Sequence, residues 1–277
     1  NAANLPEPPA TWSEFKDAVT KIPKLDSRGA LVQNGAALGE ADNVTYVADL
    51  VAALMLQNGT TMVDGNGSNA AFGGHTGSGS QAYSPGADAL RFYTDFANPA
   101  KETYSWSKDE PNAFQAFAAG KVAFVFGYWR DKAKLAALAP RITIGVANFP
   151  QIEGTLKPSY YASYYLTTVT KQSKFSNEAW DLLQFIASGD RIEQYLKSTQ
   201  QPAASRRIIT TQQQDVTLGV AAKQVLSARS WYHGFQPNVV QAAFQAMVKR
   251  VQTGTSLQEA LDFAQNQVTQ TLRNYGQ

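Results

Sequence analysis

The stretch Phe114-Gln-Ala-Phe-Ala-Ala-Gly-Lys-Val-Ala-Phe-Val-Phe-Gly-Tyr-Trp129 contains a complete change of secondary structure. Its two leading phenylalanines are three residues apart, which suits one face of a short helix, and Gly120 is a residue type that commonly ends one. Val122–Phe126 is a continuous apolar run with the length of a buried strand. A glycine follows the run, and then Tyr128 and Trp129. We predict a helix, a turn and a buried strand that presents two aromatic side chains at its end.

Outward from this stretch, three capping-box patterns mark helix starts, because a hydroxyl and a carboxylate three residues apart satisfy free backbone donors reciprocally. They are Thr11-Trp-Ser-Glu14, Ser107-Lys-Asp-Glu110 and Ser256-Leu-Gln-Glu259. A further amphipathic helix is predicted from about Asn43 to Asn58, since its apolar positions form one stripe and Gly59 follows it.

The remaining pattern predicts more helices than strands. Residues 64–86 are rich in Gly, Ser and Asn and indicate a long surface loop. Strands are expected at 142–146 and 160–170, and helices at 86–98, 190–197, 213–226, 239–251 and 257–273. A further helix is expected to start at Ser176 or Asn177 and to carry Ala179, Trp180, Leu183 and Ile186. Strands that alternate with a larger number of helices indicate an α/β or α+β fold.

Composition excludes several classes of protein. The chain has 277 residues, 44% of them hydrophobic and 17% charged, with a formal net charge of +2. This balance argues against disorder, and the absence of basic runs argues against a nucleic-acid partner. No apolar run approaches the ~20 residues of a membrane-spanning helix. With no cysteine and only His75 and His233, a thiolate site, a cysteine zinc site or a His-rich metal site is excluded.

Aromatic side chains are the strongest candidates for a binding site. Tyr128 and Trp129 could stack on the C–H face of a pyranose, or they could simply cover the core. A second group is Trp231-Tyr232-His233, which could equally be a loop that packs on a helix. In the strand expected at 160–170, alternation places Tyr161 and Tyr165 on one face. No catalytic or nucleotide-binding motif and no calcium loop occurs, so we expect neither enzyme chemistry nor a cofactor.

Five segments in order resemble family 1 extracellular solute-binding proteins of ABC importers, the maltose-binding-protein type. They are Pro8-Pro-Ala-Thr-Trp-Ser-Glu-Phe15, Phe114–Phe124 with Gly127-Tyr-Trp129, Ile144-Gly-Val-Ala-Asn-Phe-Pro150, Lys171-Gln-Ser-Lys-Phe-Ser-Asn-Glu-Ala-Trp-Asp-Leu-Leu-Gln-Phe185 and Gly254-Thr-Ser-Leu-Gln-Glu-Ala-Leu261. Each segment is weak alone, whereas the ordered set covers nearly the whole chain and is fairly specific.

The resemblance implies an α/β fold of the type II periplasmic-binding-protein kind, with two lobes and a hinge. On the family's pattern, residues 1–149 and 205–277 belong to a helix-rich C-terminal lobe, and residues 150–204 return to the N-terminal lobe. The family's first ~100 residues have no counterpart here, about a typical domain's worth of chain. The sequence is therefore expected to be a fragment or processed form. The returning segment would then expose apolar surface unless a separate chain or missing segment covers it.

The resemblance also implies site residues. Trp129 matches the family's cleft tryptophan and Tyr128 is its neighbour, while Tyr161, Trp231 and Tyr232 fall near the family's cleft. Asp42 and Asn43 align with another ligand-facing region, and the alternative role of these two residues is helix capping.

The implied function is that of a non-catalytic receptor that traps a carbohydrate between two lobes and delivers it to an ABC permease. Such a receptor is extracytoplasmic, either periplasmic or lipid-anchored at the cell surface. Two alternatives remain open at this point. One is a polysaccharide-processing enzyme, which needs two carboxyl groups ~5–9 Å apart beside the aromatic residues. The other is a scaffold whose aromatic groups form a protein interface.

Overall fold

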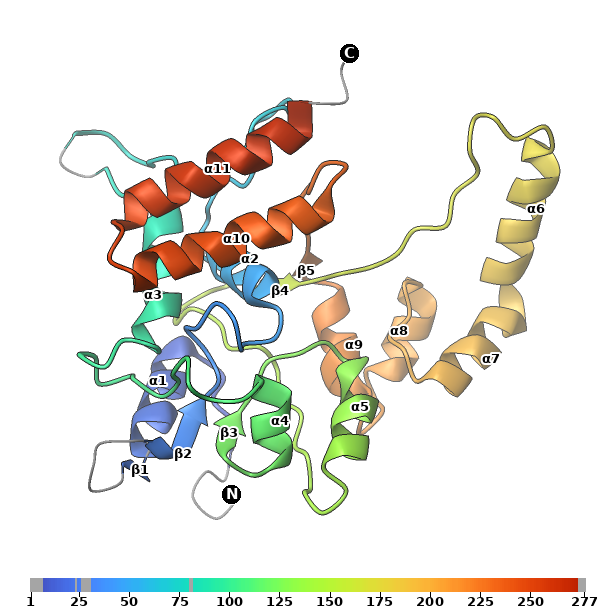
Figure 1. Ribbon diagram of the computed structural model, residues 1–277. Helices are drawn as coiled ribbons and strands as arrows, with labels where there is room; N and C mark the ends of the chain where they lie inside the picture. The colour runs from blue at the N-terminus through green and yellow to red at the C-terminus, as the bar shows by residue number, and fades with distance from the viewer. Residues whose placement is uncertain (1–6, 23, 26–30, 80–81, 274–277) are drawn as a thin grey trace. The chain divides into compact units, whose positions relative to one another are not determined.

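The computed structural model describes residues 7–22, 24–25, 31–79 and 82–273, and these residues form two compact units. Unit 1 comprises the described residues up to 161 together with those from 231 onward, and unit 2 comprises residues 162–230. Figure 1 shows both units in the colours of the sequence.

Unit 1 contains a small sheet and most of the helices. Its elements are α1 (Trp12–Lys21), β1 (Lys24–Leu25), β2 (Leu31–Ala36), α2 (Val47–Gln57), α3 (Pro85–Asp95), α4 (Ala113–Ala118), β3 (Val122–Phe124), α5 (Asp131–Leu138), β4 (Tyr160–Tyr161), α10 (Pro237–Gln252) and α11 (Leu257–Arg273). β2 is the central strand of a three-stranded sheet, antiparallel to β1 and parallel to β3. Asn34 pairs with Val122 and Ala36 with Phe124.

Helix α1 begins with the predicted capping box. Thr11 Oγ1 accepts a hydrogen bond from Glu14 N, and Thr11 N donates to Glu14 Oε2, each at 3.2 Å. Phe15 and Val19 are buried on the sheet side of the helix. The helix lies so close to β2 that a Cβ at Gly35 would be 2.8 Å from Val19 Cγ1. The glycine therefore allows α1 and the sheet to share one core.

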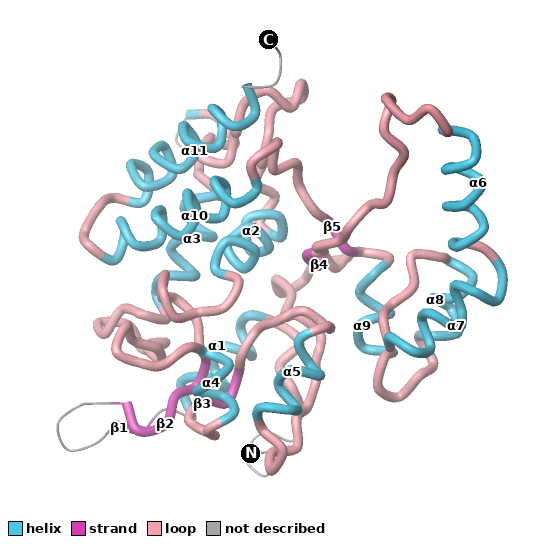
Figure 2. The backbone as a smooth tube through the Cα atoms, turned by 45° about the vertical axis from the view of Figure 1, so that its right-hand side comes forward, coloured by secondary structure: helices cyan, strands magenta, loops and turns pink. Residues whose placement is uncertain are grey.

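Helices α2, α3, α10 and α11 form the rest of the core of unit 1, and Figure 2 shows α10 and α11 side by side. The core-facing positions of α10 and α11 repeat every three to four residues, as an amphipathic helix requires. Those that are fully enclosed include Phe244, Met247, Val248, Leu261, Ala264 and Val268.

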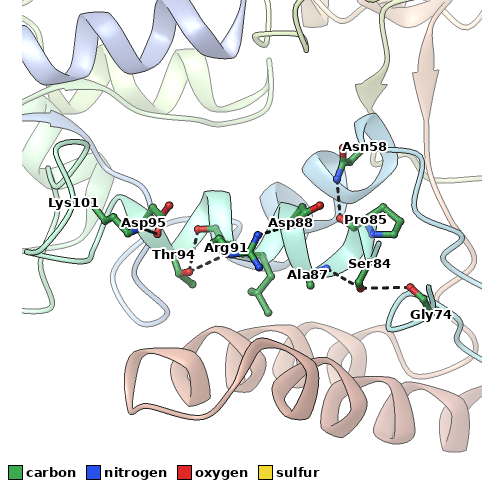
Figure 3. Close-up of polar contacts among 11 residues, drawn as sticks. Asn58, Gly74, Ser84, Pro85, Ala87, Asp88, Arg91, Thr94, Asp95 and Lys101 are labelled. Atoms are coloured by element: carbon green, nitrogen blue, oxygen red, sulfur yellow. Dashed lines mark hydrogen bonds and ion pairs between the residues drawn. The ribbon is translucent and has the colours of Figure 1, made fainter. Parts of the chain in front are cut away.

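The start of α3 is fastened to two neighbouring segments (Figure 3). Ser84 Oγ accepts from Ala87 N at 3.3 Å, which caps the helix, and donates to Gly74 O at 3.4 Å. Asn58, which follows α2, donates through Nδ2 to Pro85 O at 2.9 Å. These bonds join the end of α2, the glycine-rich loop and the start of α3.

The glycine-rich loop is also bonded to α11. Ala70 N donates to Thr269 Oγ1 at 3.0 Å, and Gly73 N donates to Gln265 Oε1 at 2.7 Å. Gln258 Nε2 returns a bond to Gly73 O at 2.9 Å. The side chains of one helix therefore satisfy the backbone groups of this loop, which has little apolar material of its own.

Unit 2 contains α6 (Ser176–Ala187), α7 (Gly189–Thr199), α8 (Arg206–Gln212), α9 (Gly219–Val225) and β5 (Ala228–Arg229). Its core is small and consists of Leu196, Ala203, Ile209 and Ala222. Helix α6 has no buried residue, and Trp180, Phe185 and Ile186 are each about half exposed. The expectation of exposed apolar side chains in the 150–204 segment holds for α6.

The structure differs from several local expectations. The capping box at Ser107 is wrong, because α4 begins at Ala113 and Asn112 caps it by accepting from Phe114 N at 3.0 Å. The strand at 142–146 is absent, and only Tyr160–Tyr161 of the strand at 160–170 is formed. Residues 163–168 are exposed. A strand needs a neighbour for its backbone groups, and an apolar sequence cannot supply that neighbour.

The boundaries of the two units also differ from the predicted segments. Residues 150–161 pack with unit 1, since Trp12 N donates to Gln151 O at 2.9 Å and Gln57 Nε2 donates to Pro150 O at 2.9 Å. Residues 205–230 pack instead with the segment that precedes them. Which lobe each segment belongs to stays a prediction.

Candidate functional site

The candidate site begins after β3, which ends at Phe124, two residues before the predicted end of the strand. After β3 the chain leaves the sheet, and Phe126 packs against Trp12, Phe15 and Phe149 with ring centroids 5.5–6.0 Å apart. Tyr128 and Trp129 then lie in the turn before α5, and both are half-buried. The aromatic core therefore holds the turn that carries these two rings.

Two carboxylates fix Tyr128. Its hydroxyl donates to Asp49 Oδ2 at 2.6 Å, and its backbone N donates to Asp131 Oδ2 at 2.8 Å. Asp131 Oδ1 also accepts from the hydroxyl of Tyr46 at 3.0 Å. The rings of Tyr46 and Tyr128 meet edge to face with centroids 4.9 Å apart. Asp131 is 8% exposed, so it is a buried charge that these donors satisfy.

Tyr46 reaches this position through an uncommon backbone conformation. It has a φ of 62°, in the left-handed region that side chains other than glycine rarely adopt. This residue directly precedes α2, so the helix begins four residues later than the predicted start at Asn43. The surrounding contacts must hold the strained residue in place, and the bond to Asp131 is one of them.

Tyr161 extends the group on the side of Asp49. Burial first, and then the Asp49 carboxylate, raise the pKa of both Tyr128 and Tyr161. Both hydroxyls therefore stay protonated and act as donors at neutral pH. We call Tyr46, Asp49, Tyr128, Asp131 and Tyr161 the aspartate–tyrosine cluster.

His233 and Trp231 lie beside this cluster. His233 Nε2 is 3.2 Å from the hydroxyl of Tyr161, and the rings of His233 and Trp231 have centroids 4.3 Å apart. Burial lowers the pKa of His233, and the Asp49 carboxylate opposes that shift. Trp231 packs in turn on Phe72 and Phe244 of the core. Tyr161 and Trp231 therefore both contact His233, and that they bind ligand stays a prediction.

Each of the two leading aromatic rings has a cation over its face. The guanidinium carbon of Arg130 is 4.5 Å from the ring centroid of Tyr128, and Lys132 Nζ is 4.8 Å from that of Trp129. Arg130 is exposed and Lys132 is half-buried. Positive charge and aromatic surface are therefore presented together.

The other three predicted site residues make contacts of a different kind. Asp42 is exposed and pairs with Lys249 Nζ at 2.7 Å. The amide of Asn43 donates to the backbone carbonyls of Ser107 and Glu110, and its Oδ1 accepts from Trp106 Nε1 at 2.8 Å. Neither residue caps α2. Tyr232 is 45% exposed and contacts the ring of Phe235. That these three bind ligand stays a prediction.

Sequence reasoning assigned no binding role to Tyr46, Asp49, Asp131 or His233. His233 was interpreted only as part of an aromatic loop. The one local signal was the position of Asp131 two residues after Trp129. Pairing of Asp49 with Tyr128 spans 79 residues of sequence, so spacing alone could not reveal it.

The described residues contain no group of three or more His, Cys, Asp or Glu side chains that could hold a metal ion. None of the described helices has the length and apolar character needed to cross a membrane.

Solved structures share the fold at low sequence identity. A cyclo/maltodextrin-binding protein complexed with maltotetraose matches with a TM-score of 0.72 and 17% identity, over 100% of this chain and 68% of that chain. The maltose/maltodextrin-binding domain MalE from Bdellovibrio bacteriovorus, bound to maltotriose, matches with a TM-score of 0.66 and 16% identity. That match covers 99% of this chain and 69% of that chain. A solute-binding protein of an ABC transporter from Thermotoga lettingae, bound with α-D-tagatose, matches with a TM-score of 0.64 and 21% identity. That match covers 96% of this chain and 66% of that chain.

The chain thus spans about two thirds of the length of these structures. No curated protein matches the sequence significantly. The family model for bacterial extracellular solute-binding proteins matches residues 1–213, which is most of the chain. The order of motifs, the fold and this match agree, so the chain belongs to the bacterial extracellular solute-binding proteins and has the fold of type II periplasmic-binding proteins.

Proposed function

We propose that this chain is the ligand-binding part of an extracytoplasmic receptor that delivers a carbohydrate, specifically an oligosaccharide, to an ABC importer. Membership of the solute-binding family supports this role. Three solved relatives carry maltotetraose, maltotriose or tagatose, which favours a sugar over other solutes. The receptor acts outside the cytoplasmic membrane, either in the periplasm or anchored by lipid at the cell surface.

The observation that carries the proposal is the aspartate–tyrosine cluster beside Trp129. A pyranose presents an apolar C–H face and a rim of hydroxyl groups, so it needs an aromatic surface next to hydrogen-bonding groups. Tyr128 and Trp129 supply the rings, and Asp49 supplies a carboxylate with further acceptor capacity beyond its bond to Tyr128. Because Asp131 and the core hold these groups in place, little ordering entropy is lost on binding.

Transport requires a response to the ligand as well as binding. In the proposed mechanism two lobes close about a hinge and trap the solute, and the permease recognises the closed state. A ligand can drive closure only through contacts that the open state lacks. Neither Tyr128 nor Trp129 alone therefore determines affinity, because ligand contacts from the opposite lobe must add to theirs.

The alternative of a polysaccharide-processing enzyme has less support. A glycosidase needs a pair of carboxyl groups aimed at the scissile bond, one of which gives up a proton. Asp49 and Asp131 are the carboxylates beside the aromatic rings, and both accept hydrogen bonds from tyrosine groups. Both carboxylates are therefore already engaged by donors of this chain, as expected of groups that position aromatic rings for binding.

Isothermal titration with maltotriose, maltotetraose and tagatose tests the proposal. Concentrations should reach the millimolar range, because contacts from one lobe alone give weak binding. We expect Trp129→Ala to weaken sugar binding by ~1–3 kcal/mol. Trp180→Ala, which removes an exposed indole from α6, is the matched control and should leave the affinity unchanged. Equal affinities of the wild type and the Trp129 variant would remove Trp129 from the site.

A further inference from the structure

The charges around the candidate site are unevenly paired. Asp49 accepts from Tyr128, and Asp131 accepts from Tyr46 and from the backbone of Tyr128. Both carboxylates are therefore bonded to neutral donors. The ion pairs of the described residues include neither Arg130 nor Lys132. Arg130 interacts electrostatically with the side chains of Tyr46 and Asp131, but among the described residues no carboxylate forms a direct salt bridge with Arg130 or Lys132.

The positions of the two cations are tied to the rings that a sugar would use. Arg130 lies over Tyr128 and Lys132 lies over Trp129, at 4.5 and 4.8 Å from the ring centroids. A cation at this distance from an aromatic face is attracted by ~0.5–1 kcal/mol at an exposed site, which is weak enough to be exchanged for a stronger partner. A carboxylate is such a partner, and it bonds a guanidinium in a bidentate manner.

We propose that this site selects acidic carbohydrates, in which a pyranose ring carries a carboxylate. The inference rests on the proposed function, because it assumes that Tyr128 and Trp129 bind a sugar. In a uronic acid the carboxylate is attached to the ring carbon next to the ring oxygen, so it projects from the edge of the sugar. A ring seated on an aromatic face therefore brings its carboxylate toward a cation beside that face.

The energetic consequence is a preference for the charged ligand. A hydrogen bond between two charged groups contributes enough to change an affinity by about tenfold or more. A neutral sugar of the same shape would gain the stacking but not this bond, and it would still have to displace the two cations from the rings.

Isothermal titration of the full chain with α-1,4-linked trigalacturonate and with its methyl ester tests the proposal. The ester keeps the three sugar rings and removes the charge. We expect the free acid to bind about tenfold or more tightly than the ester. The difference should shrink when NaCl is raised from about 50 mM to about 500 mM, since salt screens exposed charges.

Single substitutions identify which cations cause the preference for the acid. Lys132→Met and Arg130→Met keep a long apolar side chain against the ring and remove the charge, so they should reduce the preference for the acid. Lys134→Met removes an exposed cation from the same helix and is the control that should keep the preference. Acid and ester of equal affinity, or binding of maltotriose with no binding of the acid, would overturn the inference and leave the sugar receptor intact. Failure of every sugar to bind would overturn both.

Discussion

Removal of the Asp131 carboxylate should destabilise unit 1 far more than removal of an exposed carboxylate. Asp131 is buried and accepts two hydrogen bonds, from the hydroxyl of Tyr46 at 3.0 Å and from the backbone N of Tyr128 at 2.8 Å. It also begins α5, where a negative charge is favourable. Asp131→Ala loses all three interactions at once.

The expected loss of unfolding free energy in Asp131→Ala can be worked out from these three interactions. Hydrogen bonds to a charged group contribute ~1.5–3 kcal/mol each, and the charge at the helix start contributes ~0.3–1 kcal/mol. The desolvation cost of the buried carboxylate disappears in the variant and offsets part of the loss. We expect the free energy of unfolding to fall by ~2–4 kcal/mol. With a denaturant slope of ~2–3 kcal/mol per molar urea, the midpoint should fall by roughly 1 M.

Urea unfolding followed by tryptophan fluorescence measures this change. Four of the five tryptophans lie in unit 1, and Trp180 is in unit 2. A Trp180→Phe background therefore makes the fluorescence report on unit 1 alone. Asp42→Ala is the matched control, because Asp42 forms an exposed pair with Lys249 that should contribute less than ~1 kcal/mol.

Two results would refute the reasoning. The first is a midpoint for Asp131→Ala no lower than that for Asp42→Ala. The second is a double variant whose loss of stability equals the sum of the losses caused by Asp131→Ala and Tyr46→Phe alone. The two residues share one hydrogen bond, so the double variant should lose ~0.5–3 kcal/mol less than the sum of the single changes. Simple additivity would mean that Asp131 does not hold Tyr46 in place.

Three further predictions concern the core and the response to pH. Gly35→Ala should destabilise unit 1 by ~1–3 kcal/mol because its Cβ would lie 2.8 Å from Val19, whereas Gly145→Ala, with open space around it, should change stability by less than ~1 kcal/mol in urea unfolding. Burial lowers the pKa of His233, so the unfolded chain binds a proton that the native state resists; the urea midpoint should fall as the pH drops below about 6.5, and less so in His233→Gln. Burial raises the pKa of Tyr93, so only the unfolded chain ionises just above about pH 10; stability should fall there with rising pH, and Tyr93→Phe should flatten that slope.

Local signals predicted several of the helices, although the helix expected at 213–226 forms only from Gly219 to Val225 and α8 was not expected. The box at Ser256 is present, since Glu259 N donates to Ser256 Oγ at 3.3 Å and Ser256 N donates to Glu259 Oε2 at 3.2 Å. The helix that follows it begins at Leu257, as expected, and extends to Arg273, the last described residue. Capping and helix periodicity act within a few residues, so a sequence displays them directly.

Features that depend on distant partners were predicted poorly. The apolar run at 142–146 has the composition of a strand, but no ladder partner reaches it among the described residues. The same limit applies to the candidate site. Tyr128 and Trp129 could be proposed from the strand that precedes them, whereas the bond between Tyr46 and Asp131 joins positions 85 residues apart. The left-handed backbone at Tyr46, which makes that bond reachable, has no signature in composition or spacing.

Because the glycine-rich loop is hydrogen-bonded to α11, release of this helix from unit 1 and exposure of the loop are coupled. Ala70 and Gly73 rely on acceptors that lie 199 and 192 residues further along the chain. Fraying or truncation that detaches α11 from unit 1 would also expose this loop to proteases, although the sequence of the loop is unchanged. Limited proteolysis between residues 64 and 79 would thus report on whether α11 is packed against unit 1.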